Sequence, residues 1–539
     1  MRLVVAFMSG LLAALLEPVK FTWRHLLVWL QGLITAAEIK FALQQKEALF
    51  ATEVAPRPVV PSLKDIPGPT PLPFFGTGWI FNRFFGRFPL TKVHDAYKTM
   101  FREYGPIIKE EALWNYPVLS ISTAQDIEKI IKIPTKSPIR PPTSITAFYR
   151  TGFPERYNDG GLINEQGEKW HRLRTALTHD LTNTRVVQGF VPEVNNMARD
   201  FLACIAKLRN PNNGFVENVI ELDRKLGFES TCLMNLGCRV GFLEEEVNQR
   251  AQRLSDLTNV HFEMVNESYY GLALWKFFPT STWKKFSEAE HDLYELICEY
   301  LEPVIEAAGE SCQFDDVQNI LLGILKRSDL DDKDKKSGII DFIASGMNTI
   351  GNSITMMLYL MAKNPEAQSK IYEEIQSQLE PDEEITAKFL HSAKYLKACI
   401  QESFRILPTA TCVARITEID LNLSGYHVPA GSVVLSHTSE ACRSEANFVR
   451  PDEFIPERWI ASEVERNPSL HVKYPFLVSP FGFQRRMCPG KKFAEQVMQI
   501  VLASVIRRYE LRCERDLELE FKFLLAPTGQ FSLQFKERT

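Results

Sequence analysis

The distribution of apolar and polar positions predicts a protein built mostly of helices. The run Ile339–Met361 is almost free of charge, and a helix that is apolar on all sides is normally buried at the centre of a large domain. Long amphipathic stretches between Thr184 and about Lys326 carry few strand signals, and apolar residues recur at helical spacing from Phe493 to Val505. The charge-dense segment Lys326–Lys336 is expected to be an exposed loop. We therefore predict a mainly α fold.

Short β-strands are predicted in the C-terminal part of the chain. Cys412–Ile416 and Leu423–Leu435 alternate and turn as short antiparallel strands do. Leu519–Gly529 and Phe531–Phe535 are expected to pair as a closing hairpin. These strands are too few to change the fold class.

The N-terminal region differs in composition from the rest of the chain. Leu3–Leu16 is apolar but short for a spanning helix, and the aromatic-rich run Phe21–Ala37 has an interfacial character. The dense Pro/Gly run Ile66–Gly76 excludes a helix and indicates a stiff linker. We predict a targeting or membrane-anchoring segment over 1–60, a proline-rich hinge over 61–80 and one large domain over 81–539.

Composition and charge narrow the class of protein. Among the 539 residues 45% are apolar, which is enough for a sizeable core. The net charge of −5 argues against a nucleic-acid-binding protein. The ten cysteines have no paired spacing, so they are interpreted as reduced thiols in an intracellular setting.

Cys488 carries the clearest chemical signal. It lies in a Gly/Pro/Arg-rich loop directly before Phe493–Val505, close to Arg485 and Arg486. A helix N-terminus and neighbouring cations lower a thiol pKa and favour the thiolate, which acts as a nucleophile or a metal ligand. No histidine lies nearby in the sequence to activate a cysteine nucleophile. No CxxC pair indicates zinc or an iron–sulfur cluster. A single thiolate suits haem iron, and the alternative is a surface turn with a buried structural cysteine.

This loop resembles the haem-binding signature of the cytochromes P450. Phe481, Arg486, Cys488 and Gly490 match it, while Gln484 stands where the family has glycine. A non-glycine residue at positive φ is uncommon, so Gln484 is expected to bend the local turn without abolishing ligation. The resemblance implies haem b with Cys488 as the axial iron ligand, and it places Phe481 and Arg486 in the cofactor site.

The family resemblance extends to other parts of the chain. Trp170 and Arg174 are four residues apart, on one face of a predicted helix, and match the family's Trp-x-x-x-Arg motif. The resemblance implies that the indole N–H and the guanidinium bind the haem propionates, and Arg415 aligns with a family position that often does the same. A solvated basic helix with one packed tryptophan is the alternative for the first motif.

The implied fold is that of the P450 family: a large helical domain with a long central helix over the haem, plus small antiparallel sheets. Glu402 and Arg405 have ion-pair spacing on a helix, and Arg458 follows in a Pro-Glu-Arg element. Together they resemble the family's Glu–Arg–Arg triad. We assign them to the scaffold rather than to chemistry.

The central helix contains candidate catalytic residues. Ala344–Thr349 resembles the family's oxygen-activation motif, in which Gly346 would approach the haem plane and Thr349 would help deliver protons. Asn348 replaces the usual acid, and an amide orients water but does not titrate. The alternative for Thr349 is a hydroxyl bonded to its own helix backbone.

The resemblance also implies an electron donor and a location. The segment Leu274–Thr280 resembles the mitochondrial clan of the family, which implies a small acidic iron–sulfur ferredoxin as partner and a mitochondrial membrane as the site. Candidates for its basic docking face are Lys394, Lys397, Lys491 and Lys492, with solvated lysines as the alternative. If the chain is in the endoplasmic reticulum membrane, a flavoprotein reductase replaces the ferredoxin.

Four segments resemble steroid-hydroxylating members in particular: Ile163–Gly167, Tyr269–Trp275, Lys397–Ser403 and Phe523–Pro527. They imply a monooxygenase that uses a steroid and dioxygen. Hydroxylation of another lipophilic substrate stays open, as does an isomerase or dehydratase that needs no external electrons. Thr349 argues against the latter, whereas Asn348 keeps it open. A non-catalytic haem- or ligand-binding protein is the third alternative, for which Gln484 is the one hint.

Overall fold

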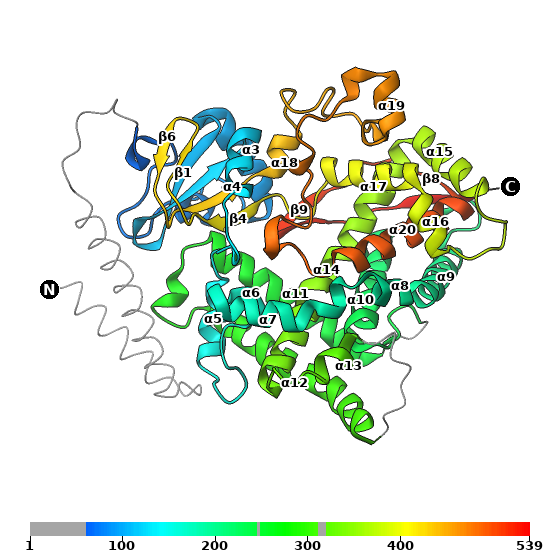
Figure 1. Ribbon diagram of the computed structural model, residues 1–539, viewed down its shortest axis with the longest axis horizontal. Coiled ribbons are helices and arrows are strands. Elements are labelled where there is room, and N and C mark those ends of the chain that lie inside the picture. The colour runs from blue at the N-terminus through cyan, green and yellow to red at the C-terminus, as the bar shows by residue number, and fades with distance from the viewer. Residues whose placement is uncertain (1–60, 245–247, 311–319, 539) are drawn as a thin grey trace.

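A computed structural model describes residues 61–244, 248–310 and 320–538. The predicted leader, 1–60, lies outside the described residues. The chain forms a smaller β-rich part, at the upper left of Figure 1, against a larger helical part. The helices begin and end as follows: α3 (Val93–Tyr104), α4 (Ala124–Ile131), α5 (Ser144–Thr151), α6 (Gly161–Asn164), α7 (Gly167–Thr182), α8 (Thr184–Gly189), α9 (Val191–Leu208), α10 (Val219–Leu236), α11 (Gln249–Tyr270), α12 (Ser281–Glu310), α13 (Ile320–Leu325), α14 (Asp332–Lys363), α15 (Pro365–Gln376), α16 (Ala387–Ser392), α17 (Lys394–Ile406), α18 (Thr438–Cys442), α19 (Ala461–Arg466) and α20 (Lys491–Arg508).

Short 3-10 helices connect these elements: η1 (Leu63–Asp65), η2 (Gly78–Phe81), η3 (Leu90–Lys92), η4 (Leu113–Asn115), η5 (Leu274–Lys276), η6 (Pro456–Trp459), η7 (Pro468–Leu470), η8 (Pro475–Leu477) and η9 (Gln484–Arg486). The predicted hinge, 61–80, lies along the first strand rather than apart from the body. Lys109 N donates to Pro67 O at 2.8 Å, and Ile66 is buried. That the segment joins a leader to the body stays a prediction.

The main sheet joins segments that are far apart in the sequence. Its order is β1 (Ile107–Ala112), β2 (Tyr116–Ile121), β7 (Val433–Ser436) and β4 (Val413–Ile416). The pairs β1–β2 and β4–β7 are antiparallel, as expected of short strands, whereas β2 and β7 run parallel. The sheet is therefore mixed, because β2 and β7 belong to segments about three hundred residues apart that sequence spacing alone does not pair.

The predicted closing hairpin is wrong in its pairing. The hairpin forms within the first segment, between β9 (Leu519–Lys522) and β10 (Leu524–Pro527), and turns at Phe523 with φ 64°. The final strand, β11 (Leu533–Glu537), pairs instead with β8 (Tyr509–Arg512) and β3 (Phe215–Val216). The remaining pair consists of β5 (Leu421–Leu423) and β6 (Tyr426–Val428).

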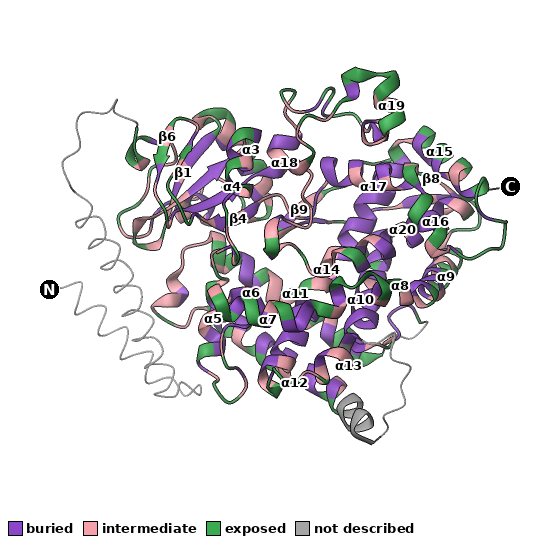
Figure 2. Cartoon of the chain, viewed as in Figure 1, coloured by how far each residue is buried: buried purple, intermediate pink, exposed green. Residues whose placement is uncertain are grey.

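The long central helix is confirmed as α14, and Figure 2 shows it largely buried within the helical part. It begins earlier than predicted, because Asp331 Oδ1 accepts a 2.9 Å hydrogen bond from Asp334 N and caps the helix. The second half of Lys326–Lys336 is therefore helix rather than loop. Helices α10 and α14 pack closely together. A Cβ on Gly227 of α10 would lie 2.6 Å from Gly351 N of α14, so this contact requires glycine.

The expected scaffold triad is present. Both Oε atoms of Glu402 lie 2.9 Å from Arg405, and Oε1 lies 3.1 Å from Arg458 Nε. All of these side chains are almost fully buried, and Trp459 Nε1 donates to Glu402 Oε2 at 2.8 Å. The carboxylate thus holds α17 to η6 with every charge paired, as buried ions require.

Candidate functional site

The loop that carries Cys488 leads from Phe483, in the core of the β-rich part, into helix α20. It passes through η9 and ends at Gly490, which precedes the first residue of α20, as the sequence predicts. Cys488 N donates to Phe481 O at 2.8 Å, so the two ends of the signature segment are held together. Phe481 packs its ring against Phe404, with the centroids 5.5 Å apart. The Phe481 side chain therefore packs the start of the loop against α17.

The protonation of Cys488 differs from the expectation. Burial raises the pKa of its thiol, although the N–H groups of Gly490 and Lys491 and the charge of Arg174 act in the opposite direction. Some of the surface of the same side chain stays accessible, although protein surrounds the thiol. The predicted low thiol pKa is wrong for the protein by itself, because desolvation outweighs the helix terminus. A coordinated cation would supply the missing stabilisation of the thiolate.

Two predicted arginines lie beside this loop. Arg174, on α7, donates to Met487 O at 2.7 Å, directly before the cysteine. Arg486 donates to Pro138 O at 2.5 Å and to Gln166 Oε1 at 2.7 Å. The predicted partner of Arg174, Trp170, is buried, and its ring lies 4.3 Å from the Arg486 guanidinium carbon. Trp170 thus supports Arg486 by a cation–π contact.

Arg415 and a residue that sequence reasoning missed complete a cationic cluster. Arg415, on β4, donates to Phe483 O at 2.6 Å and to Gln484 Oε1 at 3.1 Å. Arg140 donates through Nε and Nη2 to Ile163 O, at 3.1 and 2.7 Å. Its segment, Pro138–Pro142, is rigid and proline-flanked, but no spacing rule connects it to the cysteine loop. We call Arg140, Arg174, Arg415 and Arg486 the arginine cluster.

The arginine cluster is electrostatically strained. Burial, followed by repulsion from Arg140, Arg415 and Arg174, lowers the pKa of Arg486 to about 9. Burial and Arg140 lower that of Arg415 to about 10. Nη1 of Arg486 is buried and has no hydrogen-bond partner among the described residues. Charges crowded in this way need anions nearby, and carboxylates such as the haem propionates fit that need. The residues present therefore fit a haem whose iron is bound by Cys488.

The candidate catalytic residues Asn348 and Thr349 are consecutive residues of the central helix, α14. Thr349 Oγ1 donates to Gly346 O at 2.9 Å, which is the backbone bond of the structural alternative. Asn348 Nδ2 donates to Asn259 Oδ1 on α11 at 3.1 Å, and its own Oδ1 is buried without a partner among the described residues. A Cβ on Gly346 would lie 2.7 Å from Thr231 Cγ2. Gly346 is thus required by packing against α10, a reason that the sequence did not reveal.

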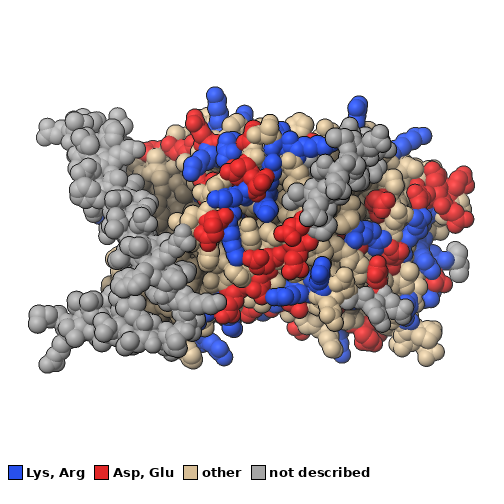
Figure 3. All heavy atoms as spheres, turned by 90° about the horizontal axis from the view of Figure 1, so that it is seen from below, with Lys and Arg blue, Asp and Glu red and all other residues tan. Residues whose placement is uncertain are grey.

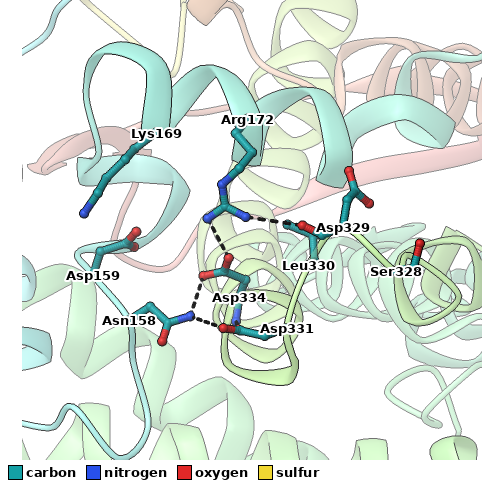
Figure 4. Close-up of a pocket in the computed structure, with 9 residues that line it drawn as sticks. All are labelled: Asn158, Asp159, Lys169, Arg172, Ser328, Asp329, Leu330, Asp331 and Asp334. Atoms are coloured by element: carbon teal, nitrogen blue, oxygen red, sulfur yellow. Dashed lines mark hydrogen bonds and ion pairs between the residues drawn. The ribbon is translucent and has the colours of Figure 1, made fainter.

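A shallow acidic pocket lies elsewhere, between the start of α7 and the start of α14. Figure 4 shows Arg172 bonded to Asp334, and Asn158 bonded to Asp331 and Asp334. None of the predicted site residues lines it. The ion pair Arg172–Asp334 joins α7 to α14 there, so we assign the pocket to the joint between the two helices.

Comparison with known proteins agrees with this site. The profile of the family Cytochrome P450 matches residues 66–535. The chain is 41% identical over 481 residues to ecdysone 20-monooxygenase of Drosophila melanogaster, covering 88% of each chain. It is 30% identical over 453 residues to the mitochondrial cytochrome P450 302a1 of the same organism, covering 83% of this chain and 89% of the relative. A third relative, the probable mitochondrial cytochrome P450 12a5, is 27% identical over 84% of this chain and 87% of its own.

Proposed function

The chain belongs to the cytochrome P450 family, and we propose that it hydroxylates ecdysone at carbon 20 to give 20-hydroxyecdysone. Family membership makes it an oxidoreductase that uses haem with a cysteine thiolate ligand. The ecdysteroid substrate is supported by the 41% identity to a relative named for that reaction. The haem supplies the oxidising chemistry, and the protein supplies binding, orientation and electrostatics.

One observation carries the haem-binding part of the proposal. Arg174, Arg415 and Arg486 lie at the loop that carries Cys488, and Arg486 Nη1 is buried without a partner among the described residues. Cys488 would bind the iron. Arg140, Arg174, Arg415 and Arg486 would hold the propionates, with Trp170 supporting Arg486.

Residues of α14 would control the transfer of protons. The Thr349 hydroxyl holds its proton on Gly346 O and can rotate to donate it elsewhere. Asn348 orients groups without titrating, since an amide holds its protons. Its bond to Asn259 ties the position of this residue to α11. Proton delivery in this chain therefore depends on Thr349 and on water rather than on a carboxylate at 348.

The reaction of the family needs a substrate, dioxygen and an electron donor. We propose a ferredoxin as that donor, since two of the compared relatives are named mitochondrial. Lys492 donates to Thr182 O, at 2.8 Å, and Lys397 to His391 O, at 2.7 Å, while Lys491 lies 3.8 Å from Glu495 Oε1. Lys394, which is exposed, is therefore the best placed of the predicted docking lysines. The face seen in Figure 3 mixes both signs of charge and is a poorer candidate for an acidic partner.

We further propose association with a mitochondrial membrane. Within the described residues no helix is both long and apolar enough to cross a bilayer. However, Phe84 is 88% exposed and Phe85 60%, and Trp114 and Phe278 are exposed as well. The ring of Phe74 packs between two of these aromatic segments. Its centroid lies 4.1 Å from that of Trp114 and 5.4 Å from that of Phe277, the residue before Phe278. Exposed aromatics of this kind favour a membrane interface.

Reconstitution of the full chain with haem, a ferredoxin and its reductase tests the proposal. We expect ecdysone to gain one hydroxyl at carbon 20, only with reduced nicotinamide and dioxygen present. Conversion of a steroid without reduced nicotinamide would indicate an isomerase or dehydratase instead. Binding of ecdysone without conversion in the complete system would indicate a non-catalytic protein. Replacement of the ferredoxin by a flavoprotein reductase tests the alternative donor and, with it, the alternative membrane.

A further inference from the structure

Gln484 adopts a backbone conformation that normally belongs to glycine. Its φ is 60°, in the left-handed region, at the position where the resembled signature has glycine. A non-glycine residue in this region is strained, because its Cβ crowds the following carbonyl oxygen. The residue is also only half-buried, so packing alone does not explain its presence. Some other interaction must offset this cost.

The side-chain amide makes that interaction with the end of α4. Gln484 Nε2 lies 3.0 Å from Ile131 O, 3.2 Å from Ile130 O and 3.4 Å from Ile133 O. The last carbonyls of a helix lack partners within the helix and carry a partial negative charge. The amide therefore caps α4 from a segment about three hundred and fifty residues away in the sequence.

The other end of the same amide holds the arginine cluster. Gln484 Oε1 accepts a 3.1 Å hydrogen bond from Arg415 Nε. Arg415 also donates to Phe483 O, at 2.6 Å, and its guanidinium carbon lies 4.8 Å from the Phe483 ring. Phe483 is buried in the core of the β-rich part, together with Ile130. One side chain thus connects α4, the cysteine loop and β4.

We propose that Gln484 is a positioning residue, which replaces the flexibility of glycine by a clamp that sets the cysteine loop and the Arg415 guanidinium in place. This inference rests on the proposed haem-thiolate function. The clamp fixes the loop at η9, four residues before Cys488, and it fixes the direction in which Arg415 presents its remaining N–H groups. It thereby maintains the geometry in which thiolate and guanidinium reach one cofactor.

Substitution of Gln484 separates the clamp from the backbone. Gln484→Gly removes both the hydrogen bonds and the strain, whereas Gln484→Ala removes the hydrogen bonds and keeps the strain. If the clamp matters, haem is retained longest by the natural chain, next by the glycine variant and least by the alanine variant. We expect haem to leave Gln484→Ala about tenfold faster than it leaves the natural chain, since the hydrogen bonds to α4 and to Arg415 are lost. The measurement is transfer of haem from the purified holoenzyme to a scavenging apoprotein.

A second measurement, of the reduction potential, distinguishes a positioning role of Gln484 from a role in stability alone. The reduction potential of the intact holoenzyme should be lower in Gln484→Ala, because a loosely held Arg415 places less positive charge beside the cofactor. A role in stability alone leaves the potential of the remaining holoenzyme unchanged. If Gln484→Ala does not fold, Gln484→Gly supplies the same comparison of potentials.

Arg450 provides a matched control. It also has a positive φ, of 47°, but its side chain is exposed and pairs with the nearby Glu453. Arg450→Gly should leave haem release and the potential unchanged. Retention by Gln484→Gly equal to or better than that of the natural chain would overturn the proposal, since Gln484 would then be a tolerated misfit. A natural chain that binds no haem would instead contradict the proposed function.

Discussion

Nη2 of Arg150 lies 2.8 Å from Oδ1 of Asp341, and the two side chains are almost completely buried. The same nitrogen lies 3.2 Å from Glu290 Oε1. Arg150 is on α5, Glu290 on α12 and Asp341 on the central α14, so one guanidinium connects two outer helices to the centre. Burial raises the pKa of Asp341. Burial acts to raise the pKa of Glu290 as well, but the positive charge of Arg150 outweighs it and the pKa falls to about 2.

Replacement of Arg150 by methionine should strongly destabilise the fold. Arg150→Met keeps the volume and removes the charge, so Glu290 and Asp341 are left buried without their cation. Loss of one partner from a buried ion pair typically costs about 3–5 kcal/mol. Thermal unfolding of the variant followed by circular dichroism measures the effect.

The exposed pair Arg253–Asp292 serves as the control. It joins α11 to α12 at 2.8 Å, but its side chains are 62% and 41% exposed. Arg253→Met should cost no more than about 1 kcal/mol. Equal losses in the two variants would show that Arg150 does not hold the three helices together.

Glu110 should give the fold a dependence on pH. Burial raises its pKa from 4.5 to about 7, although Tyr97 and Ser120 act against this. Ser120 Oγ donates to Glu110 Oε2 at 3.1 Å and lies 3.1 Å from the His437 ring. Because the folded state holds the proton more tightly than the unfolded state, stability falls as the pH rises from about 4.5 and levels off above about 7, by about 3 kcal/mol in total.

Glu110→Gln isolates this effect, since glutamine copies the protonated acid and does not titrate. The difference in thermal midpoint between the variant and the natural chain should grow in favour of the variant from pH 5 to pH 8. A difference that stays constant over this range would mean that Glu110 titrates normally. Burial lowers the pKa of His437 to about 3, so that imidazole stays neutral and does not contribute to the change.

Asn348→Asp tests whether position 348 limits proton delivery. Asn259 can rotate its amide to donate to the new carboxylate, since the two side chains are 3.1 Å apart. With a titratable group beside Thr349 we expect more hydroxylated product, and less peroxide, for each nicotinamide oxidised. Asn259→Asp places the carboxylate on α11 instead and should give no gain. An unchanged ratio in Asn348→Asp would show that protons reach the site by another route.

The sequence predicted the parts of this structure that depend on local pattern. The uncharged run around Thr349 predicts α14, since an all-apolar helix has to be central, and the helix after Gly490 follows from the spacing of Phe493 and its neighbours. The Glu402–Arg405 pair follows from helical geometry alone.

What the sequence missed depends on tertiary contacts. Arg140 joins the arginine cluster from a loop whose composition carries no signal. The thiol pKa of Cys488 depends on how much protein surrounds it, which no spacing rule measures. The sequence shows that Gln484 departs from the signature, but its partners, the carbonyls that end α4, are far away in the chain. Interactions of this kind become visible only when distant segments are brought together.

The ligation of haem by Cys488 is the central claim, and the carbon monoxide spectrum of the reduced holoenzyme tests it most directly. The natural chain should show the red-shifted band of thiolate-ligated ferrous haem, and Cys488→Ser should lose that band. Cys442→Ser is the control, because Cys442 is a buried cysteine on α18, outside the cysteine loop, and this variant should keep the band. An unchanged red-shifted band in Cys488→Ser would remove Cys488 as the iron ligand and contradict the account.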